Sequence, residues 1–108
     1  MFQIAKDQTF SWTIDVTAPH QSNQQPAGQF TAHMRLLGIA ETTRLAGESD
    51  AAFINAIVTG WDDVLDQEGQ PMPFTPENLA VLIDMPNVRL ALVRGYHTAS
   101  SGGAREKN

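Results

Sequence analysis

Four acidic side chains within a stretch of seven residues form the densest group of potential metal ligands in the sequence: Asp62, Asp63, Asp66 and Glu68. Carboxylate oxygens are the ligands that Ca²⁺ prefers in proteins. If Gly69 is placed at the invariant glycine of an EF-hand loop, however, Val64 falls at the first position, where a carboxylate is required. The EF-hand pattern therefore fails. We interpret the cluster as a solvated acidic turn, with a looser divalent-cation site as the alternative.

The remaining reactive residue types form no recognisable catalytic or ligand pattern. His20, His33 and His97 fall on separate predicted elements, and no two of them have the spacing of metal ligands on one element. The sequence contains no Gly-x-Ser-x-Gly elbow, phosphate-binding glycine loop or dinucleotide fingerprint. It also contains no cysteine, which excludes disulfides, thiolate metal sites and cysteine nucleophiles. We therefore expect a protein without enzymatic activity, cofactor or metal ion.

Charge is distributed unevenly along the chain. The formal net charge of −5 argues against nucleic-acid binding, because phosphate contacts need clustered Lys and Arg. Between Ala46 and Val88 there are eight acidic residues and no Lys or Arg. We interpret this block as a solvated acidic face; the alternatives are head-to-tail stacking of copies or attraction of a basic partner. No apolar run approaches the roughly 20 residues needed to cross a bilayer, so we expect a soluble protein that does not bind membranes.

A period of two predicts an N-terminal β-hairpin. Even-numbered apolar residues recur from Phe10 to Val16 and again from Phe30 to Leu36, with polar residues between them. The segment 18–29 contains two prolines and a glycine, which predict a loop. We expect antiparallel strands with Val16 opposite Phe30 and Phe10 opposite Leu36. Because a lone hairpin is marginally stable in water, helices or a partner must cover its apolar face.

The second half of the chain has helical periodicity. Ser49 or Asp50 can cap a helix, and Thr75 followed by Pro76 is typical of a helix start. Met85–Pro86 breaks the helical pattern, since proline disfavours helical geometry in the residue before it. We predict helices over residues 39–46 (ending near Gly47), 50–61 and 86–99, with a short helix between 76 and 85. The prediction is a single α+β domain over residues 1–99: an N-terminal antiparallel β-hairpin followed by three to four short α-helices, with a disordered polar tail over 100–108.

A turn rich in proline joins two of the predicted helices. Residues 66–69, Asp-Gln-Glu-Gly, are a turn signal in which glycine supplies a positive φ. Pro71 and Pro73 then require an extended path, bracketed by Trp61 and Phe74. Aromatic residues at such positions are more often core residues than contacts, and we favour the core. The alternative is that Trp61 and Phe74 contact a partner protein, because aromatic residues and prolines at exposed turns are common anchors of such contacts.

The segment around this turn resembles the tail assembly chaperones of long-tailed bacteriophages. The signature shared by that family is a tryptophan, a variable pair, a valine, an acidic-glycine turn and a helix start of proline, phenylalanine and serine or threonine. The residues that match it are Trp61, Val64, Asp66, Gly69, Pro71, Phe74 and Thr75. The resemblance extends over about Thr9 to Ala99.

The resemblance implies a non-enzymatic assembly factor in the cytoplasm of the bacterial host. Such proteins hold the long tape measure protein, keep it soluble, help to recruit tail tube subunits and associate with copies of themselves. The side chains that we expect to contact a partner are Trp61, Val64, Pro73 and Phe74. The alternative interpretation is a structural tail component, such as a connector or completion protein, that is retained in the virion.

Overall fold

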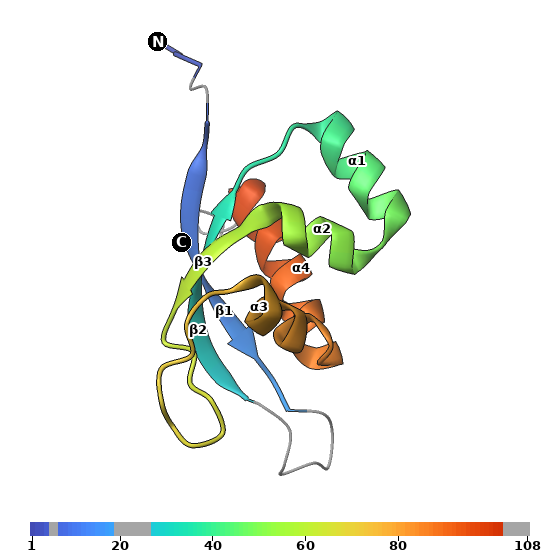
Figure 1. Ribbon diagram of the computed structural model, residues 1–108. Coiled ribbons are helices and arrows are strands. Elements are labelled where there is room, and N and C mark those ends of the chain that lie inside the picture. Colours follow the sequence, from blue (N-terminus) through green and yellow to red (C-terminus); the bar gives the residue numbers. More distant parts are fainter. Residues whose placement is uncertain (5–6, 19–26, 103–108) are drawn as a thin grey trace.

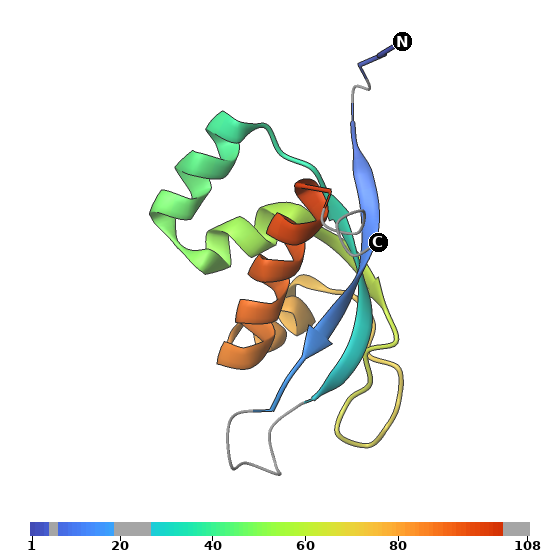
Figure 2. The same cartoon turned by 180° about the vertical axis from the view of Figure 1, so that it is seen from behind.

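In the part of the chain that the structure describes, a three-stranded antiparallel sheet carries four helices on one side (Figure 1, Figure 2). The computed structural model describes residues 1–4, 7–18 and 27–102 (Figure 1). In chain order, the elements are β1 (Thr9–Val16), β2 (Gly28–Arg35), α1 (Ile39–Glu48), α2 (Asp50–Ile57), β3 (Val58–Asp62), α3 (Pro76–Ile83) and α4 (Pro86–Ser100). The predicted α+β class, with its N-terminal hairpin, is confirmed, and a third strand is added to it.

The inner face of the sheet forms the core together with the helices. Even-numbered hairpin residues point inward as the period of two predicts: Ile14, Ala32 and Met34 are 1%, 0% and 0% exposed. Helix α4 packs along β1, and α2 lies beside it on the same side of the sheet (Figure 1, Figure 2). The odd-numbered side chains leave the opposite face polar and open to solvent. The sheet is thus covered on one side only, as is common for antiparallel sheets.

The predicted register of the hairpin is wrong by two residues. Val16 lies opposite Gly28 rather than Phe30, and Phe10 lies opposite Met34 rather than Leu36. A shift of two keeps every side chain on its predicted face, because side chains alternate with a period of two. The apolar pattern therefore fixes the face of each strand, whereas the pairing depends on how the helices and the connection constrain the two strands.

The helix predicted over residues 50–61 is also wrong in its last four residues, 58–61. Helix α2 ends at Ile57, and the next five residues form β3, which pairs with β2. The residue pairs are Trp61 with Ala32 and Gly60 with His33, with an irregularity before Val58 meets Met34. Pairing with β2 satisfies backbone groups on an edge that would otherwise be open, and this outweighs the local helical spacing.

The predicted helix starts are confirmed. The Ser49 hydroxyl accepts a hydrogen bond from the Ala52 amide at 3.0 Å, which caps α2. The Thr75 hydroxyl accepts one from the Asn78 amide at 3.0 Å, and Pro76 occupies the first position of α3. Each cap satisfies an amide that would have no partner within the helix.

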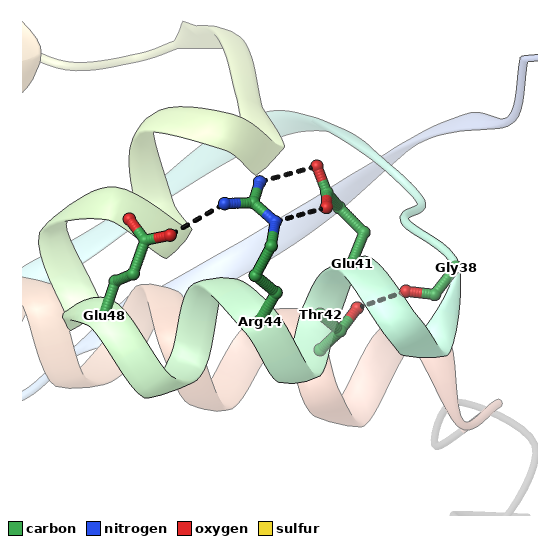
Figure 3. Close-up of polar contacts among 5 residues, drawn as sticks. All are labelled: Gly38, Glu41, Thr42, Arg44 and Glu48. Carbon is green, nitrogen blue, oxygen red and sulfur yellow. Dashed lines mark hydrogen bonds and ion pairs between the residues drawn. The ribbon is translucent and has the colours of Figure 1, made fainter.

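Helix α1 projects from the body of the molecule and relies on contacts within itself (Figure 1). It begins at Ile39 as predicted, ends two residues later than predicted, and buries only Leu45. Arg44 donates to Glu41 at 2.8 and 2.9 Å and to Glu48 at 2.7 Å (Figure 3). The hydrogen bond from Arg44 holds the pKa of Glu41 below its usual value. Pairs at these spacings stabilise a helix that has little tertiary packing.

Replacing Arg44 with alanine should loosen α1 alone. We expect amide hydrogens of α1 to exchange about twofold faster, with an unchanged midpoint of global denaturation, because the lost pairs lie within one exposed helix. Since the pKa of Glu41 is lowered on folding, its contribution is present above pH 4.5 and is lost as the pH falls through the folded value. Hydrogen exchange with mass spectrometry checks this, with Arg94→Ala on α4 as the control. Unchanged exchange in α1 would contradict the role of Arg44.

Some sequence predictions fall outside the described residues. These are the centre of the predicted loop (19–26), which includes His20, and most of the predicted tail (103–108). Within the described part, Ser100 is the last residue of α4, and Ser101 and Gly102 form a turn after it.

Candidate functional site

A cavity of about 750 Å³ opens where the hairpin end of the sheet meets α3 and the segment 63–75, which connects β3 to α3. We call it the apolar groove. Its apolar wall comes from five parts of the chain: the end of β1, β2, the connecting segment, the end of α3 with Met85 after it, and the start of α4. The residues of this wall are Val16, Phe30, Val64, Met72, Leu82, Met85 and Val88. The hairpin end and the segment 63–75, which line the groove, lie at the end of the molecule opposite the N-terminus (Figure 1, Figure 2).

The segment 63–75 is held in shape by its own hydrogen bonds. The Asp66 carboxylate accepts from the amides of Glu68 and Gln70, both at 2.9 Å, and the Asp66 amide donates to the Gln70 carbonyl at 2.8 Å. Gly69 has a φ of +79°, the left-handed conformation that its position in the predicted turn requires. The Met72 amide donates to the Val64 carbonyl at 2.8 Å. This wall of the groove is therefore a closed, ordered turn.

Trp61 anchors the same segment to the sheet. It lies on β3, only 9% exposed, and its indole Nε1–H donates to the Met72 carbonyl at 2.7 Å. Phe74 packs edge-on against the Trp61 ring, with ring centroids 4.9 Å apart. Both aromatic rings belong to the core and its margin, the interpretation that the sequence favoured. Their contact fixes where Met72 lies in the groove wall.

The four predicted contact residues therefore occupy different positions. Val64 is half-buried and lines the groove, and Pro73 is exposed on the connecting segment. Trp61 and Phe74 support that segment from the core side. Sequence reasoning missed Val81, which is 50% exposed and lines the groove. The sequence did contain a signal for Val81, because it is an apolar residue on the outward side of a helix whose inward side is already apolar.

The groove has an acidic margin. Asp63, Asp66 and Glu68 line it and are exposed to solvent. Among the described residues that line the groove, none is Lys, Arg or His. Leu65, which lies between Asp63 and Asp66 in the chain, also lines the groove and is 60% exposed. The arrangement places apolar surface beside negative charge.

The acidic turn does not gather into a metal centre. Across residues 1–4, 7–18 and 27–102, no group of three or more His, Cys, Asp or Glu side chains is placed to hold a metal ion. One carboxylate oxygen of Asp66 already accepts two amide hydrogen bonds within the turn. The carboxylate of Asp66 is thus used to build the turn.

The outer face of the sheet carries a line of side chains that the sequence did not reveal. The Ser11 hydroxyl lies 2.7 Å from His33 Nδ1, and His33 Nε2 lies 2.8 Å from an Asp62 carboxylate oxygen. A Cβ at Gly60 would lie 3.4 Å from His33 Cδ2, at the near limit of ordinary van der Waals contact. The side chains of His33 and Asp62 are 40% and 64% exposed, and neither lines the groove. A serine hydrolase needs a substrate cavity and an oxyanion hole beside its triad. We therefore interpret this line as cross-strand hydrogen bonding.

Comparison with known proteins identifies a family to which the chain belongs. The chain matches a family model described as phage tail assembly chaperone over residues 2–108. Searches of curated proteins and of solved structures give no match. Within the described residues, every helix is too short or too polar to span a membrane.

Proposed function

Because this chain belongs to the phage tail assembly chaperone family, we propose that it binds the tape measure protein, keeps it soluble and helps to recruit tail tube subunits. The family match over nearly the whole chain is the observation that carries this proposal. This chaperone activity would take place in the cytoplasm of the bacterial host and would involve no catalysis. No nucleic acid, membrane or cofactor takes part in it.

The physical reason for such a chaperone is the length of its client. A tape measure protein is a long helix with apolar stripes, which aggregate when they stay exposed. An apolar groove with an acidic margin supports the proposal, since its apolar wall can cover a stripe while its charges keep the complex in solution. Val64 and Pro73 are the proposed contacts, with Trp61 and Phe74 supporting them.

Association between copies is part of the same proposal. Phe2 and Ile4, close to the N-terminus in the chain, are 83% and 79% exposed. The N-terminus lies at the end of the molecule away from the segments that line the groove (Figure 1). An apolar end that docks on a surface of the next copy other than the groove makes head-to-tail contacts, which extend into open assemblies and do not close as a two-fold dimer. Copies arranged in this way would follow a long client.

Co-expression with the tape measure protein tests the proposed function. We expect the soluble fraction of the tape measure protein to rise severalfold and the two chains to elute together, because the chaperone covers apolar stripes. An unrelated acidic protein of similar size is the control. Unchanged solubility without a complex would contradict the proposal. Mass spectrometry of purified particles then separates a chaperone, which should be missing, from a tail component retained in the virion.

A further inference from the structure

We propose that the apolar groove binds a helical segment of the client whose apolar stripe is bordered by Lys or Arg side chains. This rests on the proposed function and adds where the client binds and which of its segments are recognised. The geometry and charge of the groove define both.

The groove is built for apolar side chains. Its wall contains two methionines, Met72 and Met85, whose unbranched and polarisable side chains adapt to different shapes. Leu65 and Val81 extend the apolar surface outward, at 60% and 50% exposure. A client that offers many different stripes along its length requires this kind of adaptable surface.

A small polar molecule does not fit these features. The volume of about 750 Å³ lies within the range of roughly 300–1,000 Å³ found for small-molecule sites. Such sites also hold polar groups that converge on the ligand. Here the charged groups are carboxylates exposed on the margin, and one oxygen of Asp66 already accepts from two amides of its own turn. Apolar contact therefore dominates the groove.

A helix fits the groove better than an extended peptide does. Strand β2 pairs on both sides, and the turn at 64–72 closes its own hydrogen bonds from Met72 to Val64 and from Asp66 to Gln70. Neither of these two walls presents a free strand edge to which a peptide strand could add, and the edge strand β1 contributes only Val16 to the lining. A helix satisfies its own backbone groups internally and needs only apolar contact from its partner.

Charge selects among helices. Asp63, Asp66 and Glu68 border the groove, and the 41 residues between Ala46 and Val88 contain no Lys or Arg. A stripe flanked by Glu or Asp would meet like charge, whereas flanking Lys or Arg would be attracted and steered towards the groove. Attraction between exposed charges weakens with added salt.

Binding of synthetic helices to the full chain tests this inference. One peptide carries a leucine stripe bordered by lysines, and the other carries the same stripe bordered by glutamates. We expect the lysine peptide to bind at least about tenfold more tightly at low salt, with a smaller difference at high salt. Equal affinity of the two peptides would overturn the role assigned to charge.

Substitutions at exposed positions locate the site. Val81→Asp places a carboxylate in the groove and should weaken binding of the lysine peptide by about tenfold or more. Leu90→Asp is the matched control, because Leu90 is 48% exposed on α4 and does not line the groove.

The double variant Asp63→Asn, Glu68→Gln should bind the lysine peptide severalfold more weakly, and its affinity should depend less on the salt concentration. Asparagine tolerates the positive φ of 67° at position 63. Circular dichroism confirms that each variant is folded.

Recovery of the tape measure protein separates this inference from the proposed function. Loss of the complex in Val81→Asp but not in Leu90→Asp supports the groove as the client site. If Val81→Asp recovers the client as well as the original chain does, the inference is wrong and the function stands. If the original chain recovers no client, the proposed function is wrong and the peptide affinities alone decide the inference. If Val81→Asp changes only the sedimentation of the free chain, a second copy occupies the groove and the inference is overturned.

Discussion

Replacing Trp61 with alanine is expected to lower the free energy of unfolding by about 3–5 kcal/mol. The indole is 9% exposed, packs edge-on against Phe74, and donates to the Met72 carbonyl at 2.7 Å. Its removal leaves a cavity beside β3 and releases the anchor of the segment 63–75. Domains of this size are typically stable by only about 5–15 kcal/mol, so this loss is a large share of the total stability. Denaturant titration followed by circular dichroism measures the loss.

Trp61→Phe separates the ring from its hydrogen bond. Phenylalanine keeps an aromatic contact with Phe74 but has no donor for the Met72 carbonyl, so we expect a loss of about 1 kcal/mol from the missing hydrogen bond. The same variant should show faster amide exchange in the segment 63–75 than the original chain does. If Trp61→Ala unfolds at the same denaturant concentration as the original chain, the anchoring role is refuted.

Gly95→Ala should destabilise the protein by about 1–2 kcal/mol, although alanine favours helix over glycine by about 1 kcal/mol. A Cβ at Gly95 would lie 2.6 Å from Cδ1 of Ile14 and 3.4 Å from Cδ1 of Trp12. Ile14 is 1% exposed and has little room to move, so overpacking outweighs the helical gain. Gly47→Ala is the matched control, because beyond its chain neighbours and the backbone of α1 no described atom lies within 4 Å of a Cβ at that position. It should leave stability unchanged or raise it by up to about 1 kcal/mol.

A double-mutant cycle identifies the clash. Ile14→Val removes the methyl group that meets the new Cβ and alone costs about 0.5–1.5 kcal/mol. The double variant Ile14→Val, Gly95→Ala should be more stable than the sum of the two single changes predicts, by about 1 kcal/mol. Strict additivity would show that the close approach of α4 to β1 is not what limits residue 95. Thermal and denaturant unfolding of the four proteins supply the cycle.

Local patterns in the sequence were sufficient for the helix starts, the turn and the inward faces of the hairpin. The caps at Ser49 and Thr75 and the positive φ of Gly69 each depend on a few neighbouring residues. The face of each strand follows from the alternation of side chains between Phe10 and Val16. The signature from Trp61 to Thr75 indicated the phage tail assembly chaperone family, and the match of the chain to the model of that family confirms this.

Non-local pairing was beyond the reach of those patterns. The apolar spacing of residues 53–61 suits a helix, yet the chain leaves the helix after Ile57 because β2 offers an edge to pair with. The hairpin register differs by two residues for a related reason, since either register buries the same side chains. The line from Ser11 through His33 to Asp62 also exists only because three strands place these residues side by side.

The sequence by itself determined which residues are apolar, which are acidic, where helices start and which family the chain resembles. Only the tertiary structure decided that Trp61 lies on a strand as an anchor and that Val64, Val81 and Met85 share one groove with Asp63. The physical reason is that caps, turns and strand faces are set by neighbours a few residues apart. A groove, in contrast, is the space left between elements that are distant in the chain, and its shape depends on how all of them pack.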